Sequence, residues 1–145
     1  MLYFRNMTLE DIEYIYNHEV LKPLVTVPPI GQKFGVVIDD RGNIIGGATG
    51  YTDNDRAVIQ KIVVDDVPQS QILKESLIRS VIYILERKGI KTIFIDKCEE
   101  ELCERIGFRE STDINKDSLL FIDTAKFFQK TCCSSSIEIN KTKKI

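Results

Sequence analysis

The sequence predicts one α/β domain in which helices flank a mixed central sheet of about six to seven strands. Three observations lead to this fold class. Short apolar runs separated by turn residues extend from residue 34 to residue 64, as in a series of strands. A long segment with apolar residues at helical spacing follows them. The continuous apolar run Thr92–Ile95 comes next and is typical of an interior strand.

The N-terminal part predicts a short strand and a capped helix. Leu2–Arg5 is the strand. Thr8 is a good N-cap, Asp11 stands three residues on, and apolar residues then recur at helical spacing to about Asn17. Three prolines and a glycine between His18 and Gln32 exclude a long helix, so we expect an irregular loop or one short helical turn there.

Three further apolar runs predict an antiparallel meander, because short turns join them. The runs are Phe34–Ile38, Ile44–Tyr51 and Ala57–Val64. The middle run is rich in glycine, which inside a strand often marks a bulge or a close approach of two backbones.

A long helix follows the meander. Apolar residues from Leu73 to Leu85 lie on one helical face, and Lys88-Gly89 is a typical helix end. The segment Val58–Ile95 is therefore expected to form a strand-helix-strand unit whose two strands are parallel.

The remaining chain completes the order β-α-α-β-β-β-α-β-α-β-β. Glu99–Arg105 predicts a short acidic helix, and Phe108–Ser111 and Ser118–Asp123 predict the final strands. We expect one domain over residues 1–129, followed by a basic tail, 130–145, that is poorly ordered because it shows no periodicity.

Composition and charge exclude several classes of protein. The chain is 43% hydrophobic and 29% charged, as in globular proteins. Because it shows neither a long apolar stretch nor a signal-like N-terminus, we expect a cytoplasmic protein that enters no membrane. The net charge is −2, but residues 130–145 carry +3, which leaves −5 on the rest. A net negative charge on residues 1–129 argues against nucleic-acid binding.

The cysteines do not show zinc-type spacing. They are Cys98, Cys103, Cys132 and Cys133, and the single histidine, His18, is distant in sequence. We expect reduced thiols and no metal. A metal pair or a disulfide between Cys98 and Cys103 is the alternative.

Three segments, taken in order, resemble the GNAT acetyltransferases. Phe4–Asp11 is similar to the family's opening strand and its R-x-x-x-x-x-D helix start, and Gly42–Gly47 to the turn into the family's third strand. Ile62–Asp65, the long helix and Glu104–Phe108 resemble the fourth strand and a Y-E-K-x-G-F ending. Together they cover roughly residues 3–123. The resemblance implies the GNAT fold, acetyl-CoA as co-substrate and transfer to an amine.

The resemblance also implies where acetyl-CoA binds. In the family, the pantetheine arm pairs like an extra strand with a splayed fourth strand. The pyrophosphate lies on the next loop and helix start, where unpaired N–H groups and the helix dipole favour an anion. The family's loop pattern is Q/R-x-x-G-x-G/A. Aligned here, the cofactor-binding positions are Ile62, Val63, Val64, Gln69, Ser70, Gln71, Ile72, Leu73 and Lys74.

This sequence departs from the family's loop pattern, since only Gln69 keeps it. Ile72 and Lys74 replace small residues. Helix side chains lean toward the N-terminus, so we expect Ile72 to crowd a phosphate, whereas Lys74 adds favourable charge. Two aspartates just before the loop oppose an anion. The alternative is an ordinary helix start with Ser70 as a possible N-cap.

Two residues are candidates for catalysis. The family's tyrosine, which often protonates the departing thiolate, aligns with Cys103. This thiol can donate a proton, although a small buried residue is the alternative. On the fourth strand Gln60 can hold a water, while Lys61 would serve as a base only with a strongly lowered pKa. His18, whose imidazole suits base chemistry, lies in the loop that borders the acceptor site in this fold.

Three functions stay open from the sequence. The first is an N-acetyltransferase that acts on a small amine or a peptide amine by direct transfer. The second is a non-catalytic module that keeps the fold and binds acyl-CoA. The third is a structural domain, for example in a homodimer, that uses an exposed strand edge or the Gly46–Gly50 strand for contact. Fold alone does not choose among them.

Overall fold

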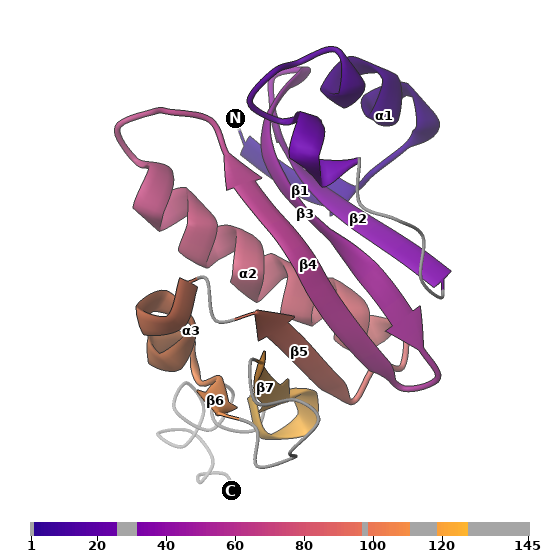
Figure 1. The fold of residues 1–145 in the computed structure, drawn as a ribbon, viewed down its shortest axis with the longest axis vertical. Coiled ribbons are helices and arrows are strands. Elements are labelled where there is room, and N and C mark those ends of the chain that lie inside the picture. Colours follow the sequence, from indigo (N-terminus) through magenta and orange to yellow (C-terminus); the bar gives the residue numbers. More distant parts are fainter. Residues whose placement is uncertain (1, 26–31, 97–98, 111–118, 128–145) are drawn as a thin grey trace, which may run out of the picture.

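The computed structural model describes residues 2–25, 32–96, 99–110 and 119–127. It confirms the predicted fold class, with the elements in the expected order (Figure 1). The elements are β1 Leu2–Asn6, α1 Leu9–Tyr16, the 3₁₀ turn η1 Lys22–Leu24, β2 Gln32–Asp40, β3 Asn43–Asp53, β4 Arg56–Val64, α2 Ser70–Arg87, β5 Thr92–Asp96, α3 Glu100–Ile106, β6 Arg109–Glu110 and β7 Leu119–Asp123.

The strands form one mixed sheet of seven, in the order β1-β2-β3-β4-β5-β7-β6. Strands β1 to β4 pair antiparallel, which confirms the predicted meander. Strands β4 and β5 pair parallel across the α2 crossover, as expected of a strand-helix-strand unit. Strand β7 lies between β5 and β6 and is antiparallel to both.

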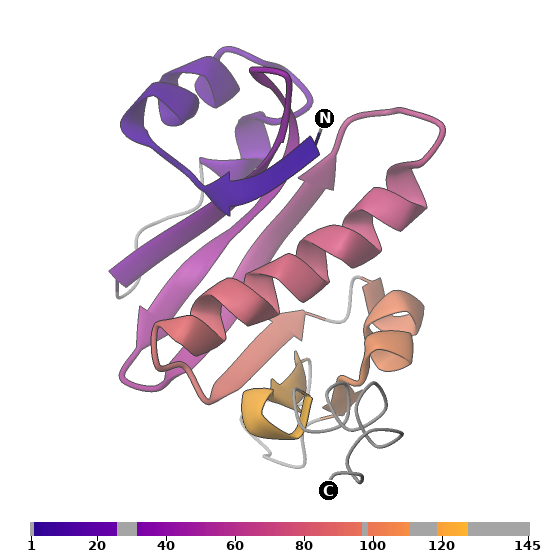
Figure 2. The ribbon, with the colours of Figure 1, turned by 180° about the vertical axis from the view of Figure 1, so that it is seen from behind.

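Helices cover both faces of the sheet. Helix α2 crosses one face, and α1 and η1 lie on the other (Figures 1 and 2). The side chains of β2 point alternately to the two faces of the sheet, so this strand contributes to the core on both sides. Val36 and Ile38 belong to the apolar cluster that contains Leu77 of α2, whereas Val37 belongs to a second cluster with Ile15 of α1.

The helix ends follow the sequence signals with one difference. Thr8 is the N-cap of α1, and its Oγ1 accepts a hydrogen bond from the Asp11 N–H while the Asp11 carboxylate accepts one from the Thr8 N–H. Helix α2, in contrast, begins at Ser70, so its N-cap is Gln69, whose side chain makes no capping bond. Gly89 has a φ of 92°, which suits glycine, and follows the end of α2 as expected.

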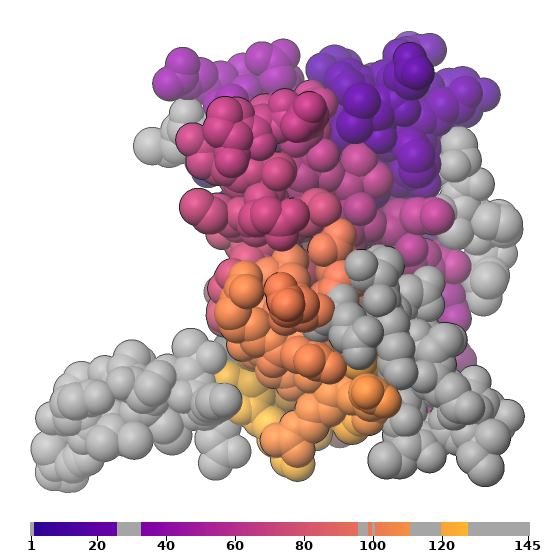
Figure 3. Space-filling model, turned by 60° about the vertical axis from the view of Figure 1, so that its left-hand side comes forward, coloured from indigo at the N-terminus to yellow at the C-terminus, as the bar shows by residue number. Residues whose placement is uncertain are grey.

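Helix α3 packs against the first half of α2, as the orange and pink surfaces show in Figure 3. Two ion pairs join them: Lys74 Nζ lies 3.0 Å from Glu99 Oε2, and Arg105 Nη2 lies 3.0 Å from Glu75 Oε1. The guanidinium groups of Arg105 and then Arg79 hold the pKa of Glu75 below its ordinary value.

The expectation that the Gly46–Gly50 strand could serve as a contact surface is wrong. Strand β3 lies between β2 and β4, and residues 46–50 are buried. The Gly46–Gly50 strand is therefore closed to a partner. The structure does not test the division at residue 129, since the tail 130–145 and also Cys98, Cys132 and Cys133 lie outside the described residues. Among the described helices, none combines the length and apolar character needed to span a membrane.

Candidate functional site

Strand β4 loses one of its two neighbours halfway along its length. It pairs with β5 at four positions, from Arg56 opposite Thr92 to Ile59 opposite Ile95. From Gln60 to Val64 it continues beside β3, but no described strand pairs with its other edge. Backbone N–H and C=O groups require partners, so this half-strand is an edge to which another extended chain can bond.

A β-bulge lies where the pairing with β5 ends. Lys61 pairs with Thr49 and Ile59 pairs with Gly50, so Gln60 is the extra residue between them. A Cβ at Gly50 would overlap the Val58 carbonyl oxygen and approach the Phe34 ring, so the backbones are too close here for any other residue. The extra residue thus belongs to β4, and the glycine of β3 opposite it allows the close approach of the two backbones.

The bulge also decides which β4 side chains face each layer. Ile59 is buried on the α2 side, and simple alternation would turn Lys61 toward the same core. Because of the extra residue, Ile62 packs on the α2 side and Val63 on the α1 side, while Lys61 is exposed. The irregularity thus keeps the charge of Lys61 out of the core, while Gln60, one residue after Ile59, faces the opposite side by simple alternation.

A cavity of about 280 Å³ opens on that face, between α1, η1 and the strands β2 to β4. Its polar groups are few. The Thr49 hydroxyl donates to the Leu24 carbonyl at 2.7 Å, which ties η1 to β3. The residues that line the cavity are Met7, Ile12, Leu24, Val25, Lys33, Phe34, Gly35, Thr49, Gly50 and Gln60. None of these carries a carboxylate.

Beyond the end of β4, the start of α2 presents backbone donors. The Ser70 N–H donates to the Val67 carbonyl at 3.0 Å, and the Leu73 N–H to the Gln69 carbonyl at 2.9 Å. Within the described part of the chain, the N–H groups of Gln71 and Ile72 face no acceptor. Such orphan donors at the N-terminus of an 18-residue helix favour an anion.

Side chains at this helix start have different surroundings. Ile72 is 67% exposed and Gln69 and Gln71 are exposed too, so all three border the solvent at the orphan donors. Leu73 is buried in the α2 core. Lys74 is engaged by Glu99, which draws its charge toward α3. Among the aligned loop positions, Gln69, Gln71 and Ile72 therefore face solvent, whereas Leu73 packs in the core and Lys74 pairs with Glu99.

Cys103 lies far from solvent. Its residue is 0% exposed, and it belongs to the same apolar cluster as Leu77 and Phe108. This burial favours the packing alternative, because a proton donor must reach the departing thiolate. Its catalytic role stays a prediction.

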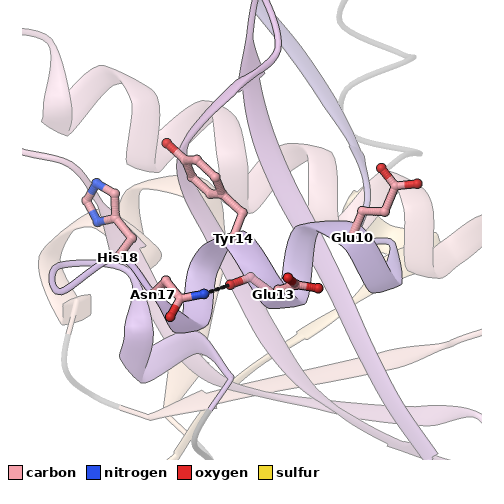
Figure 4. A pocket seen from close by; sticks show the side chains of 5 residues that line it. All are labelled: Glu10, Glu13, Tyr14, Asn17 and His18. Carbon is pink, nitrogen blue, oxygen red and sulfur yellow. Dashed lines mark hydrogen bonds between the residues drawn. The ribbon is translucent and has the colours of Figure 1, made fainter.

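His18 occupies a separate place. Its Nε2 lies 4.0 Å from Asp65 Oδ2, its ring stands 6.0 Å from that of Tyr14, and its Nδ1 is buried without a hydrogen bond. Figure 4 shows both rings at one end of a shallow depression along α1 that Glu10, Glu13 and Asn17 complete. Asp65 lies five residues beyond Gln60, about 16 Å along an extended chain. His18 is thus not brought to the Gln60 cavity.

Sequence reasoning named Gln60 and the edge Ile62–Val64, whose roles stay predictions, but did not name the apolar walls of the cavity. Met7 lies between β1 and α1, Leu24 lies in η1 and Phe34 lies in β2. No local pattern distinguishes a wall residue from an ordinary core residue. The signal that existed was glycine within β3, which marked the bulge but not the cavity beside it.

Comparison of the sequence with protein-family models and with curated proteins finds no match. The structure, however, matches solved acetyltransferases over most of its length. It matches the ribosomal-protein-S18-alanine N-acetyltransferase of Escherichia coli with a TM-score of 0.67, covering 86% of this chain and 94% of that one at 18% identity. The fold is that of the GNAT acetyltransferases.

Two further structures support the GNAT fold. A protein from Desulfovibrio desulfuricans assigned to the GNAT family gives a TM-score of 0.64 at 14% identity, with 86% and 99% of the two chains covered. The PaiA N-acetyltransferase of Thermoplasma acidophilum, solved in complex with coenzyme A, gives 0.62 at 10% identity, with 85% and 99% covered. These low identities describe a divergent version of the GNAT fold.

Proposed function

We propose that this protein transfers an acetyl group from acetyl-CoA to a primary amine. One observation carries the proposal: the half of β4 from Gln60 to Val64, whose outer edge pairs with no described strand, lies between a partly open cavity and the start of α2. When the extended arm of acetyl-CoA pairs with this edge of β4, its phosphates lie toward α2 and its acyl group lies toward the cavity. The GNAT fold and its acetyltransferase neighbours point to the same chemistry.

The backbone groups of this site are complementary to acetyl-CoA, whereas its side chains are not. The arm's amide groups are complementary to a free strand edge, and the N–H groups of Gln71 and Ile72 suit a pyrophosphate. Side chains oppose this fit, because Asp65 and Asp66 add negative charge and Ile72 occupies the helix start. We expect binding that is weaker than a glycine-rich loop gives.

The reaction joins the amine nitrogen to the acyl carbon and breaks the carbon–sulfur bond. The amine loses one proton and the departing thiolate gains one. Among the cavity residues, Gln60 can orient a water but cannot accept a proton, and Lys33 is a cation. Holding the amine beside the thioester is therefore the main contribution, and effective molarities make it worth several kcal/mol without a dedicated acid or base.

A second candidate function is binding of acyl-CoA without transfer. Two observations favour it: Cys103 is fully buried, and Gln60 is not ionisable. In this case the acyl group occupies the cavity and no amine enters it.

The test begins with a titration of acetyl-CoA and free CoA into the purified protein. Saturation at about 100 times the dissociation constant stabilises the native state by roughly 2.7 kcal/mol, which a thermal shift detects. Release of CoA in the presence of a primary amine then supports transfer. Binding without release favours the second candidate, and no binding at millimolar ligand refutes both.

A matched pair of variants locates the phosphate site. Ile72→Asp places a carboxylate beside the orphan N–H groups, and Ile72→Asn has the same shape without the charge. Because Ile72 is 67% exposed, neither change disturbs the core. We expect Ile72→Asp to weaken acetyl-CoA binding about tenfold relative to Ile72→Asn through repulsion of the phosphates. Equal dissociation constants would place the phosphates elsewhere.

A further inference from the structure

We infer that the cavity beside Gln60 selects amines that carry one aliphatic or aromatic group and no second charge. This inference rests on the proposed function and names its substrate class. The chemistry of the walls carries it. Met7, Ile12, Leu24, Val25 and Phe34 supply most of the lining.

The polar groups of the cavity do not suit a diamine. None of the described lining residues is acidic. The Thr49 hydroxyl proton is already donated to the Leu24 carbonyl. A second ammonium group would lose its hydration without meeting a counterion among these lining residues, which is strongly unfavourable.

The volume sets the size of the apolar group. An apolar cavity of about 150 Å³ holds a benzene ring. The cavity here is about 280 Å³, which leaves room for an amine together with one branched aliphatic or aromatic group. Gln60 fixes the direction, because it lies where the free edge of β4 begins. The amine therefore lies toward Gln60 and the apolar group toward α1 and η1.

Butylamine and 1,4-diaminobutane test the inference directly, because they share a chain and differ by one ammonium group. Acetyl transfer to each is measured as kcat/KM with the wild-type protein, beside ethylamine, phenethylamine and a tripeptide that begins with leucine. We expect butylamine and phenethylamine to exceed 1,4-diaminobutane and ethylamine by about tenfold or more. Comparison of the tripeptide with the small amines tells whether the apolar amine belongs to a peptide.

A pair of variants on α1 provides the control. Ile12 lines the cavity and is 40% exposed, whereas Leu9 is 85% exposed on the same helix and does not line it. We expect Ile12→Glu to shift the preference toward 1,4-diaminobutane by about tenfold or more, because it supplies the missing counterion. Leu9→Glu adds the same charge outside the cavity and leaves the preference unchanged.

The outcomes separate this inference from the proposed function. Acetyl transfer with equal or greater preference for the diamine overturns the selectivity but keeps the function. If acetyl-CoA binds without transfer, calorimetry with the protein–CoA complex decides, and butylamine must bind more tightly than 1,4-diaminobutane. Absence of acetyl-CoA binding refutes the proposed function and the inference with it.

Discussion

The Arg5 guanidinium donates hydrogen bonds to both carboxylate oxygens of Asp11, at 2.7 and 3.1 Å. It also donates to Asp39 at 3.0 Å, so one side chain joins β1, α1 and the end of β2. These contacts raise the pKa of Arg5, and the bond from Arg5 holds the pKa of Asp11 below its ordinary value. The spacing of Arg5 and Asp11, which resembles the GNAT helix start, therefore has a structural cause.

Asp11→Asn tests this ion pair through the pH dependence of stability. Asparagine can still accept the Thr8 N–H bond, so the variant removes mainly the charge. Because the folded pKa of Asp11 is depressed, its stabilisation is present above the unfolded value of about 3.9 and is lost as pH falls through the folded pKa. We expect urea denaturation to show a loss of about 1–2 kcal/mol at pH 7 that vanishes at low pH, once the pH is below the folded pKa of Asp11.

Glu10→Gln is the control for Asp11→Asn, since Glu10 is an exposed carboxylate on the same helical turn. It should change the unfolding free energy by less than about 0.5 kcal/mol at either pH. A pH-independent loss in Asp11→Asn would show that packing, not charge, is what the variant removes.

Gly50→Ala tests the bulge. The new Cβ would overlap the backbone oxygen of Val58, which cannot move without breaking the β3–β4 pairing. We expect a loss of more than about 3 kcal/mol, or an insoluble protein. Gly42→Ala is the comparison, because its Cβ meets open space and only the φ of 93° opposes it, at about 1–2 kcal/mol. Equal stabilities for the two variants would contradict the observed register.

Local signals predicted most of the fold, because each element here has its own pattern. Thr8 and Asp11 form the capping box that marks α1, and the apolar spacing from Leu73 to Leu85 marks α2. The glycines of β3 indicated a bulge or a close backbone approach, but not its position at Gln60. The run Ile62–Val64 is apolar throughout, so its sequence contains no alternation that could reveal the change of face.

The candidate site was harder to predict, because long-range contacts create it. The cavity joins Met7, Leu24 and Gln60, and Lys74 meets Glu99 across 25 residues. Even the free edge of β4 depends on where β5 ends, and nothing in β4 itself indicates that position.

Cys103→Ala separates a packing role from an acidic one. If Cys103 only fills the core, the variant keeps kcat within about twofold and loses about 1–2 kcal/mol of stability. The two measurements are acetyl transfer at saturating substrates and urea denaturation. A fall in kcat of about 100-fold or more in a protein of unchanged stability would instead identify a proton donor.

Gln60→Glu tests whether the bulge faces the reacting amine. A primary amine with a pKa of about 10 is mostly protonated at pH 7, so the wild-type rate should rise about tenfold per pH unit between pH 6 and 9. A carboxylate at residue 60 can take the amine proton through a water and should raise the rate at pH 7 by about tenfold or more while flattening this slope. Gln60→Ala should lower the rate at every pH without changing the slope. Acetyl-CoA titrations of all three proteins separate chemistry from binding, and identical profiles for the two variants would place the amine away from Gln60.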